Sequence, residues 1–374
     1  MDTRPRSVIL DPFAGAGTTL IEGKFEGHKA IGFEINPLLH FVCKTSVEWR
    51  LDVSSLRKEL ADIREKVVQR RAEVKGRSIE ELGYLLPPIH DVYRWWRKDV
   101  LLDLLILLEA IQSSALGQKH VKFFELALAG VLVPDLTNVT LGRLQLHFID
   151  RTRHTIRVWE TFNAHILTML SDLEKVSTLT DIGEAEVYHV DSTNHQLKGR
   201  LPPVDRVVTS PPYPNRYSYV WNTRPHLYFL GFFDGPKPAS QLDLKTIGGT
   251  WGSATSVLAK GTVDPAFEVI EREVSPLADE IRKADNLMAN YVMKYFNMLA
   301  QQIVSQDCLL SRDAQVAYVV GCSTIKDVYI ETDVLLGKIF EGLDLGYKVR
   351  RIERFRQRHS GKDLHESTVY AARC

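Results

Sequence analysis

Four consecutive residues near the middle of the chain combine a hydroxyl, two rigid backbone positions and an aromatic ring: Ser210, Pro211, Pro212 and Tyr213. Two successive prolines remove two backbone donors and fix φ, so the Pro211 carbonyl is held as a rigid hydrogen-bond acceptor. That carbonyl and the Ser210 side chain could accept hydrogen bonds from the two N–H groups of an amine, and Tyr213 could stack on a planar base. Taken alone, the same four residues also fit a loop that merely carries two structural prolines.

A second motif, DPFAGAGTT, begins at Asp11, directly after a short apolar run. Gly15 and Gly17 permit positive φ and let the backbone approach a ligand closely, near the free N–H groups of a helix start. Glu34 ends the next strand pattern, where a carboxylate can accept hydrogen bonds from both ribose hydroxyls of a nucleoside. The order of strand, Asp, Gly-x-Gly, helix, strand and Glu therefore predicts a site for a nucleoside cofactor.

The spacing of these glycines disfavours two other cofactors. The motif is not GxxxxGK[ST], which excludes ATP binding through a phosphate loop. The pattern GxGxxG is only partly matched, because Leu20 stands at its last position, and this argues against NAD.

The series DPFAGAGTT, GFEINP, VDS and TSPPY resembles the S-adenosylmethionine-dependent amino-methyltransferases of DNA. The resemblance implies that the glycine motif holds the methionine part of the cofactor, Glu34 the ribose, Ile35 a face of the adenine and Asp191 its amino group. Ile35 and Asp191 also have ordinary interpretations, as a core residue and a strand-end turn. The residues of the glycine motif that it assigns to the cofactor are Asp11, Phe13, Gly15, Gly17 and Thr18.

The same resemblance implies that the loop from Ser210 to Tyr213 holds the target base, and TSPPY is similar to the N4-cytosine branch. An exocyclic amine is a poor nucleophile because its lone pair is conjugated with the ring. Acceptors aimed at its N–H bonds help the nitrogen to become tetrahedral, and the base must first leave the duplex stack. Methylation at cytosine C5 is disfavoured, since none of the four cysteines follows a proline.

The elements that must position these residues alternate between strand and helix, which predicts an α/β fold with a mainly parallel sheet. Strands are expected over residues 7–10, 29–37, 185–193, 204–210 and 314–321, helices up to residue 26 and over 276–306 and 332–343, and a terminal β-hairpin over 346–358 and 367–374. Residues 213–264 are expected to be irregular. Together with the resemblance, this is a Rossmann-like methyltransferase fold with a large helical insertion.

We expect residues 1–40 and 181–374 to form the catalytic domain and residues 41–180 to form the helical insertion, with a role in target recognition or partner binding. The family normally carries a further cofactor-side element upstream of the first strand, and here only about six residues precede it. A protein partner supplying that element is therefore a possibility that the resemblance raises.

The overall composition is that of a globular protein, with 44% hydrophobic and 25% charged residues. The 47 basic residues balance the 47 acidic ones, so an argument for nucleic acid must come from local clusters. No Cys-x-x-Cys pair occurs, so we expect no zinc site or other metal and a reducing, cytoplasmic location. No apolar run is long enough to span a bilayer, and no signal peptide is recognisable.

Local clusters suggest where DNA is contacted. The arginine-rich residues 350–362 suit phosphate contacts, with Arg354 and Arg356 as the chosen candidates, although an edge hairpin with solvated arginines is equally consistent. Asn215 and Arg216, after the Pro-Pro-Tyr motif, could touch the target base or its neighbours. The stretch YRWWRK at 93–98 is expected to place its tryptophans in a core.

We therefore predict a DNA methyltransferase that acts on a flipped base, with cytosine N4 as the favoured target and restriction–modification as the setting. Methylation of adenine N6 in DNA or of guanine N2 in RNA is an open alternative. A second alternative is a cofactor-binding but inactive subunit of a restriction or defence assembly.

Overall fold

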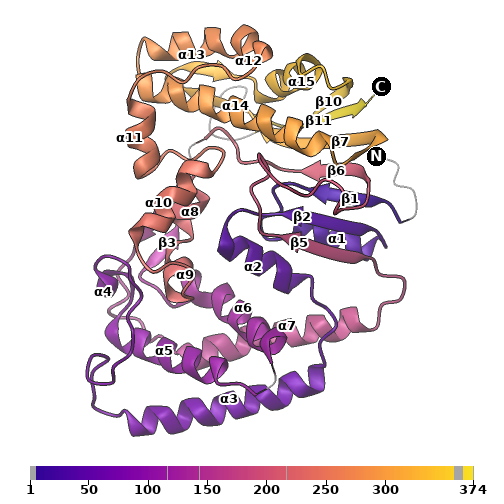
Figure 1. Ribbon diagram of the computed structural model, residues 1–374. Coiled ribbons are helices and arrows are strands. Elements are labelled where there is room, and N and C mark those ends of the chain that lie inside the picture. Colours follow the sequence, from indigo (N-terminus) through magenta and orange to yellow (C-terminus); the bar gives the residue numbers. More distant parts are fainter. Residues whose placement is uncertain (1–5, 116, 143, 216, 358–364, 374) are drawn as a thin grey trace. The chain divides into compact units, whose positions relative to one another are not determined.

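The computed structural model describes residues 6–115, 117–142, 144–215, 217–357 and 365–373 (Figure 1). The chain divides into two compact units. The first comprises Met1–Lys44, Asp181–Val220 and Ser240–Cys374, and the second comprises Thr45–Thr180 and Trp221–Ala239. The second unit thus takes in a segment that follows the Pro-Pro-Tyr motif by only a few residues.

The first unit is built on one sheet, whose seven strands among the described residues lie in the order β10-β11-β7-β6-β1-β2-β5 (Figure 1). The pairs from β7 to β5 are all parallel, whereas β11 runs antiparallel to both β7 and β10. This confirms the predicted mainly parallel sheet and its terminal hairpin. The strands are β1 (Val8–Asp11), β2 (Lys29–Phe33), β5 (Glu184–Tyr188), β6 (Val204–Thr209), β7 (Leu310–Gly321), β10 (Tyr347–Gln357) and β11 (His365–Arg373).

Several predicted boundaries were wrong. The second and third predicted strands end at Phe33 and Tyr188, before the polar residues that follow them. The single helix predicted over 276–306 is instead divided between two helices, because Pro276 lies in the first turn of one and Asp285 caps the other. The segment expected to be irregular contains four short helices.

The following helices belong wholly or partly to the first unit. They are α1 (Thr18–Phe25), α2 (Pro37–Ser46), α8 (Tyr219–Asn222), α10 (Pro236–Lys245), α11 (Ser253–Ala259), α12 (Glu268–Glu273), α13 (Ser275–Arg282), α14 (Asn286–Asp307) and α15 (Thr332–Gly342). A short two-stranded ribbon, β8 (Ser323–Ile325) and β9 (Val328–Ile330), precedes α15.

The longest of these helices, α14, shows why the core forms. Its apolar residues Val292, Phe296, Leu299 and Ile303 follow helical spacing, and all four are fully buried. Each such side chain contributes roughly 1.5–3 kcal/mol when it is removed from water. They belong to one core cluster with residues of the central strands, such as Val207.

The second unit is mainly helical. It contains α3 (Val53–Glu73), α4 (Val92–Trp95), α5 (Lys98–Gln112), α6 (Gln118–Asp135), α7 (Val158–Ser177), α9 (Arg224–Phe229) and the small ribbon of β3 (Val139–Leu141) and β4 (Leu146–Phe148). Trp95 and Trp96 are 5% and 0% exposed, which confirms that the tryptophans of YRWWRK are core residues. Among the described residues, no helix is long and apolar enough to cross a membrane.

Candidate active site

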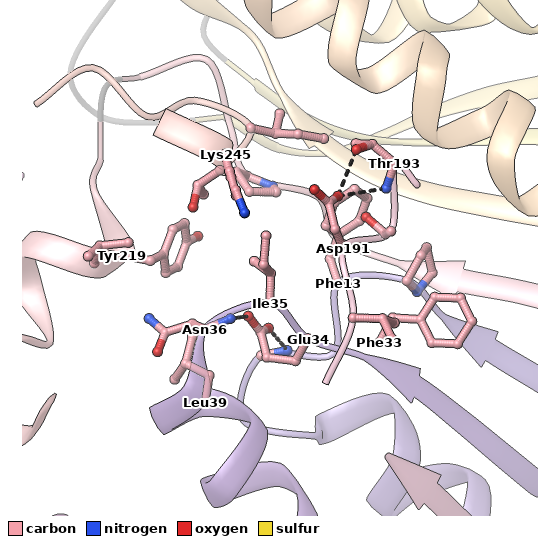
Figure 2. A pocket seen from close by; sticks show the side chains of 18 of the residues that line it. Phe13, Phe33, Glu34, Ile35, Asn36, Leu39, Asp191, Thr193, Tyr219 and Lys245 are labelled. Carbon is pink, nitrogen blue, oxygen red and sulfur yellow. Dashed lines mark hydrogen bonds between the residues drawn. The ribbon is translucent and has the colours of Figure 1, made fainter. Parts of the chain in front are cut away.

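A cavity of about 170 Å³ lies in the first unit, where residues that follow β1, β2, β5 and β6 come together (Figure 2). The carboxyl ends of neighbouring parallel strands open at the same edge of a sheet, which is where α/β proteins bind ligands. Of the residues predicted from the sequence, the cavity is lined by Phe13, Gly15, Glu34, Ile35, Asp191, Ser210 and Pro212. Figure 2 shows Glu34, Ile35 and Asp191 gathered there, with Tyr219 and Lys245 toward the other side.

The glycine turn between β1 and α1 is held by short local contacts. The Ala14 N–H donates to the Phe33 carbonyl at 3.0 Å, which ties the turn to the end of β2. Gly17 has φ of +96°, and a Cβ there would lie 2.8 Å from the Cys43 Sγ. Both the left-handed conformation and the close approach of α2 therefore require glycine at position 17.

Glu34 joins this turn to the cavity. Its Oε2 accepts a hydrogen bond from the Gly15 N–H at 2.9 Å, and its Oε1 accepts one from the Asn36 N–H at 2.8 Å. Burial raises the pKa of Glu34 to about 7, although these two hydrogen bonds oppose the shift. The carboxylate is thus fixed in orientation, and further hydrogen-bond donors from a ligand would favour its charged form.

Asp11 is placed differently from the other predicted cofactor residues. It is 4% exposed, and its Oδ1 accepts hydrogen bonds from the Thr209 Oγ1 at 2.6 Å and the Phe13 N–H at 3.0 Å. Burial raises its pKa. Asp11 therefore links the ends of β1 and β6, and it does not line the cavity; nor do Gly17 and Thr18.

Asp191 and Ile35 lie at the cavity on two other strand ends. The Asp191 Oδ1 accepts hydrogen bonds from the Thr193 N–H at 2.9 Å and the Thr193 Oγ1 at 2.7 Å (Figure 2). The Ile35 carbonyl lies 3.0 Å from the His189 Nε2, which fixes the backbone that carries its side chain.

The Ser-Pro-Pro-Tyr loop follows β6 and is held by residues far away in the sequence. The Tyr295 hydroxyl, from α14, donates to the Pro212 carbonyl at 2.9 Å. Tyr213 packs against Gly321 at the end of β7, where a Cβ would lie 2.8 Å from the Tyr213 ring. Ser210 is exposed and lines the cavity, whereas the buried Pro211 and half-buried Tyr213 do not line it.

A buried polar network supports the far rim of the cavity, and no pattern in the sequence indicated it. Asp243 is completely buried and accepts hydrogen bonds from the Ser218 Oγ at 2.5 Å and the Trp251 N–H at 2.8 Å. Lys294 donates to the carbonyls of Gly249 at 3.1 Å and Thr246 at 3.4 Å. Burial lowers the pKa of Lys294 to about 8, and the Asp243 charge opposes that shift.

Further cavity residues that were not predicted from the sequence include Asn36, Tyr219 and Lys245. Asn36 directly follows the Glu34–Ile35 pair and accepts a hydrogen bond from the Leu38 N–H at 3.0 Å, at the start of α2. A polar residue this close to the acid at the strand end could have been predicted to line the cavity. Nothing in the local pattern indicated Lys245, which lies at the end of α10.

The residues predicted to contact nucleic acid lie in two parts of the first unit, the terminal hairpin and the segment after the Pro-Pro-Tyr motif. Arg354 on β10 is half exposed, and its guanidinium lies 3.3 Å from both Glu331 and Asp333. Arg356 pairs with Glu366 in the backbone register of the terminal hairpin. Asn215 accepts a hydrogen bond from the Tyr217 N–H at 3.1 Å, and Arg216 lies outside the described residues.

Comparisons with known proteins relate the chain to DNA methyltransferases. A family profile described as DNA methylase (N6_N4_Mtase) matches residues 1–41, which include the glycine turn and Glu34. The Type II methyltransferase M.MvaI of Kocuria varians is 22% identical over 352 residues, which cover 89% of this chain and 74% of that protein. The chain is therefore similar to the amino-methyltransferases of DNA.

Other similarities are weaker. The Type II methyltransferase M.BsoBI of Geobacillus stearothermophilus is 25% identical over 239 residues, covering 60% of this chain and 47%, about half, of that protein. Two structures of the rRNA methyltransferase aviRa from Streptomyces viridochromogenes are 11% identical, cover 99% of this chain and 78% of theirs, and have TM-scores of 0.30 and 0.31. None of these relatives separates the N4-cytosine branch of the family from the N6-adenine branch.

Proposed function

We propose that this chain is a DNA amino-methyltransferase, which transfers a methyl group from S-adenosylmethionine to an exocyclic amine of a base flipped out of duplex DNA, with cytosine N4 as the target. The observation that supports the proposal best is that Glu34 and Ser210, from motifs far apart in the sequence, line one cavity. The proposed cofactor acid and the proposed acceptor for the substrate amine would thus face the same cavity.

The residues of this cavity fit the cofactor. A volume of about 170 Å³ is below the roughly 300–1,000 Å³ of whole-ligand pockets, so the cavity suits one part of the cofactor, its adenosine. Glu34 offers a fixed carboxylate to the ribose hydroxyls, Ile35 an apolar surface to the adenine, and Asp191 an acceptor to the adenine amino group. When bound, the cofactor supplies an electrophilic methyl group on a sulfonium centre.

The methionine end of the cofactor is proposed to lie along the glycine turn. Gly15 lines the cavity directly, and Phe13 provides an apolar wall beside it. The roles of Asp11, Gly17 and Thr18 are then to shape the turn, since Asp11 bonds to Thr209 and Gly17 permits the left-handed backbone. Much of the rate would come from holding methyl and amine in line.

On the substrate side, we assign the Ser210 side chain and the Pro211 carbonyl as acceptors for the two amine N–H groups. These acceptors stabilise the nitrogen as its lone pair leaves conjugation with the ring. The Pro212 carbonyl already receives the Tyr295 hydroxyl, which anchors the loop. The Tyr213 ring is positioned by Gly321 and offers its remaining surface for stacking on the flipped base.

The direct test is methyl transfer to DNA followed by identification of the modified nucleoside by mass spectrometry. N4-methylcytosine supports the full proposal, and N6-methyladenine or N2-methylguanine in RNA would replace only its target. In single-turnover experiments at saturating cofactor, Ser210→Ala is expected to slow transfer by roughly 10²–10³-fold with unchanged cofactor affinity. Ser311→Ala, on β7, is the control. Wild-type rates in Ser210→Ala would remove the loop from catalysis and favour the inactive-subunit alternative.

Tyr213→Ala tests the other half of this assignment. It is expected to weaken capture of the flipped base by roughly 1–3 kcal/mol, because a stacking partner is lost. A mismatch or an abasic site at the target should partly restore DNA binding by this variant, since the unpairing is then already done. The absence of any such rescue would argue that Tyr213 is only a packing residue of the loop.

We also propose that Asn215 and Arg216 contact the target base or its neighbours, and that Arg354 and Arg356 contact DNA phosphates. Replacing Arg354 and Arg356 with Ala should weaken binding to all duplexes alike and reduce the salt slope by roughly 2. An unchanged slope would leave Arg354 as a structural partner of Glu331 and Asp333. Residues 41–180 are proposed to serve target recognition or partner binding, together with the segment Trp221–Ala239 of the same compact unit.

A further inference from the structure

Three residues that can bind a metal ion come together in the first unit, apart from the residues that line the candidate active site. Cys322 directly follows β7, Asp333 lies in the first turn of α15, and His365 begins β11. Their exposed fractions are 1%, 0% and 8%. A backbone hydrogen bond of 3.1 Å from the Cys322 N–H to the His365 carbonyl holds two of them side by side.

The polar atoms of these side chains converge. The Cys322 Sγ lies 3.5 Å from the His365 Nε2 and 3.4 Å from the Asp333 Oδ1. The same His365 Nε2 lies 3.1 Å from the Asp333 Oδ2. Because one ring nitrogen faces both the thiol and the carboxylate, this is not a Cys-His-Asp proton relay, which needs both ring nitrogens.

These separations match the spacing of ligands around a small divalent ion. Ligand atoms about 2.0–2.3 Å from a tetrahedral zinc ion lie roughly 3.3–3.8 Å from one another. The distances of 3.1 Å from His365 to Asp333 Oδ2, 3.4 Å from Cys322 to Asp333 Oδ1 and 3.5 Å between Cys322 and His365 are close to these edges, and either carboxylate oxygen could serve as the ligand. Among the described residues, this is the group of histidine, cysteine and acidic side chains whose ligand atoms come close enough to hold a metal ion.

We propose that Cys322, Asp333 and His365 form a structural Zn²⁺ site. A thiolate, an imidazole and a carboxylate are all ligands that zinc accepts in proteins, and a water molecule would complete the tetrahedron. On binding, the Cys322 thiol gives its proton to solvent as the sulfur–zinc bond forms, so one Zn²⁺ enters and one H⁺ leaves. The widely spaced cysteines gave no indication of this site from the sequence.

The surroundings fit an outer shell for such a site. The Ser367 Oγ donates to the Asp333 Oδ2 at 2.7 Å, and the Arg354 Nε lies 3.3 Å from the same oxygen. Such hydrogen bonds orient a ligating carboxylate. They also satisfy the carboxylate when no ion is bound, so a purely hydrogen-bonded network is the alternative that the experiment must exclude.

The site would stabilise the residue that supports the Tyr213 ring. Cys322 directly follows Gly321, and Tyr213 packs on Gly321. An ion that joins the ends of β7, β11 and α15 would fix this position. The proposal goes beyond the methyltransferase function and does not depend on it.

The test uses the full chain without a polyhistidine tag, stripped with a chelator and titrated with Co²⁺. We expect roughly one Co²⁺ per chain, with a thiolate-to-cobalt charge-transfer band that Zn²⁺ abolishes by displacement. Cys322→Ser should lose the band and His365→Gln should weaken binding by at least about tenfold. Cys308→Ser, which changes an exposed cysteine, is the matched control and should bind as the wild type does. A spectrum without the thiolate band, or the same binding in Cys322→Ser, would overturn the proposal.

A second measurement on the unmodified chain guards against variants that fail to fold. Alkylation of each cysteine is followed by peptide mass spectrometry with and without Zn²⁺. Zinc should slow the alkylation of Cys322 at least about tenfold, because the reagent must wait for the ion to leave, and should not slow that of Cys308. Equal rates at Cys322 with and without zinc would show that the cluster is a hydrogen-bonded network.

Discussion

The glycine turn and the Ser-Pro-Pro-Tyr loop both follow central strands, but they are held in different ways. The turn is fixed by residues close to it in the sequence: Gly15 bonds to Glu34, and Ala14 bonds to Phe33. The loop is fixed by residues of distant elements, since Tyr295 of α14 bonds to the Pro212 carbonyl and Gly321 of β7 receives the Tyr213 ring.

This difference shows how each half of the cavity depends on the rest of the fold. The glycine turn and Glu34, on the proposed cofactor side, belong to one βαβ unit, so their contacts with each other depend on a short stretch of sequence; Asp191, on the same side, follows β5. The substrate side needs α14 and β7 in place before its carbonyls and ring are oriented. Changes in the turn should therefore act on cofactor binding, and changes in α14 should act on methyl transfer with little effect on the cofactor.

The largest effect is expected for Gly17→Ala. The new Cβ would lie 2.8 Å from the Cys43 Sγ, and its φ of +96° is strained for any residue with a side chain. We expect the free energy of unfolding to fall by roughly 2–5 kcal/mol, with loss of cofactor binding. Urea denaturation and calorimetry measure the two quantities.

Two controls separate the backbone strain of Gly17→Ala from its steric clash with Cys43. Gly76→Ala has a similar φ of +81° with no atom within 4 Å of the new Cβ, so it should show only the backbone strain. Adding Cys43→Ala to Gly17→Ala should recover the steric part. If Gly17→Ala were no worse than Gly76→Ala, the close approach of α2 would not constrain the turn.

The next effect concerns Glu34 and the cofactor. Glu34→Ala is expected to weaken S-adenosylmethionine binding by about 1–3 kcal/mol through the loss of charged hydrogen bonds. Because burial raises the pKa of Glu34 to about 7, the free carboxyl group takes up a proton as the pH falls through that value. Affinity should then drop by up to about tenfold per pH unit below that pKa, since binding requires the carboxylate.

Glu34→Gln removes this titration and keeps the size of the side chain. Its affinity should be lower than that of the wild type above the pKa and independent of pH around it. Calorimetry measures the cofactor affinity of the wild type and of Glu34→Gln across this pH range. A wild-type affinity that does not change with pH would contradict the assignment of the ribose to Glu34.

The glycine turn could be predicted from the sequence, whereas the contacts that hold the Ser-Pro-Pro-Tyr loop could not. Residues 1–41 contain β1, the turn, β2 and Glu34, and alternating local patterns were enough to predict them. Tyr295 and Asp243 were missed because an ordinary tyrosine on a helix and an ordinary aspartate carry no local indication of a partner dozens of residues away. Predicted strands also ran too far, since apolar and β-branched residues such as Ile35 and Val190 continue past the last ladder pairs.

Tyr295→Phe should produce a smaller change on the substrate side. It removes the donor to the Pro212 carbonyl and leaves the ring packing intact. A buried hydrogen bond of this kind contributes about 0.5–1.5 kcal/mol, so we expect single-turnover methyl transfer to slow by up to about tenfold. Cofactor affinity should not change. Tyr318→Phe is the control, because it loses a buried hydrogen bond to Gln302 on the same core; equal losses of rate in both variants would mean general destabilisation.

The smallest expected effect is a pH dependence of stability caused by Lys294, which donates to the carbonyls of Thr246 and Gly249 at the far rim of the cavity. Burial lowers its pKa to about 8 from an ordinary value of 10.5. Between these values the unfolded chain binds more protons than the folded chain, so the free energy of unfolding contributed by Lys294 rises with pH. We expect a rise on the order of 1 kcal/mol, which Lys294→Met should abolish.

A second variant, Asp243→Asn, tests the same cause. It removes the charge that raises the Lys294 pKa, so the rise in the free energy of unfolding should begin at a lower pH. If urea denaturation gave the same slope for the wild type and Lys294→Met, Lys294 would be solvated in the folded chain. The far rim would then lack this support, and the contrast between the Ser-Pro-Pro-Tyr loop and the glycine turn would still rest on Tyr295 and Gly321.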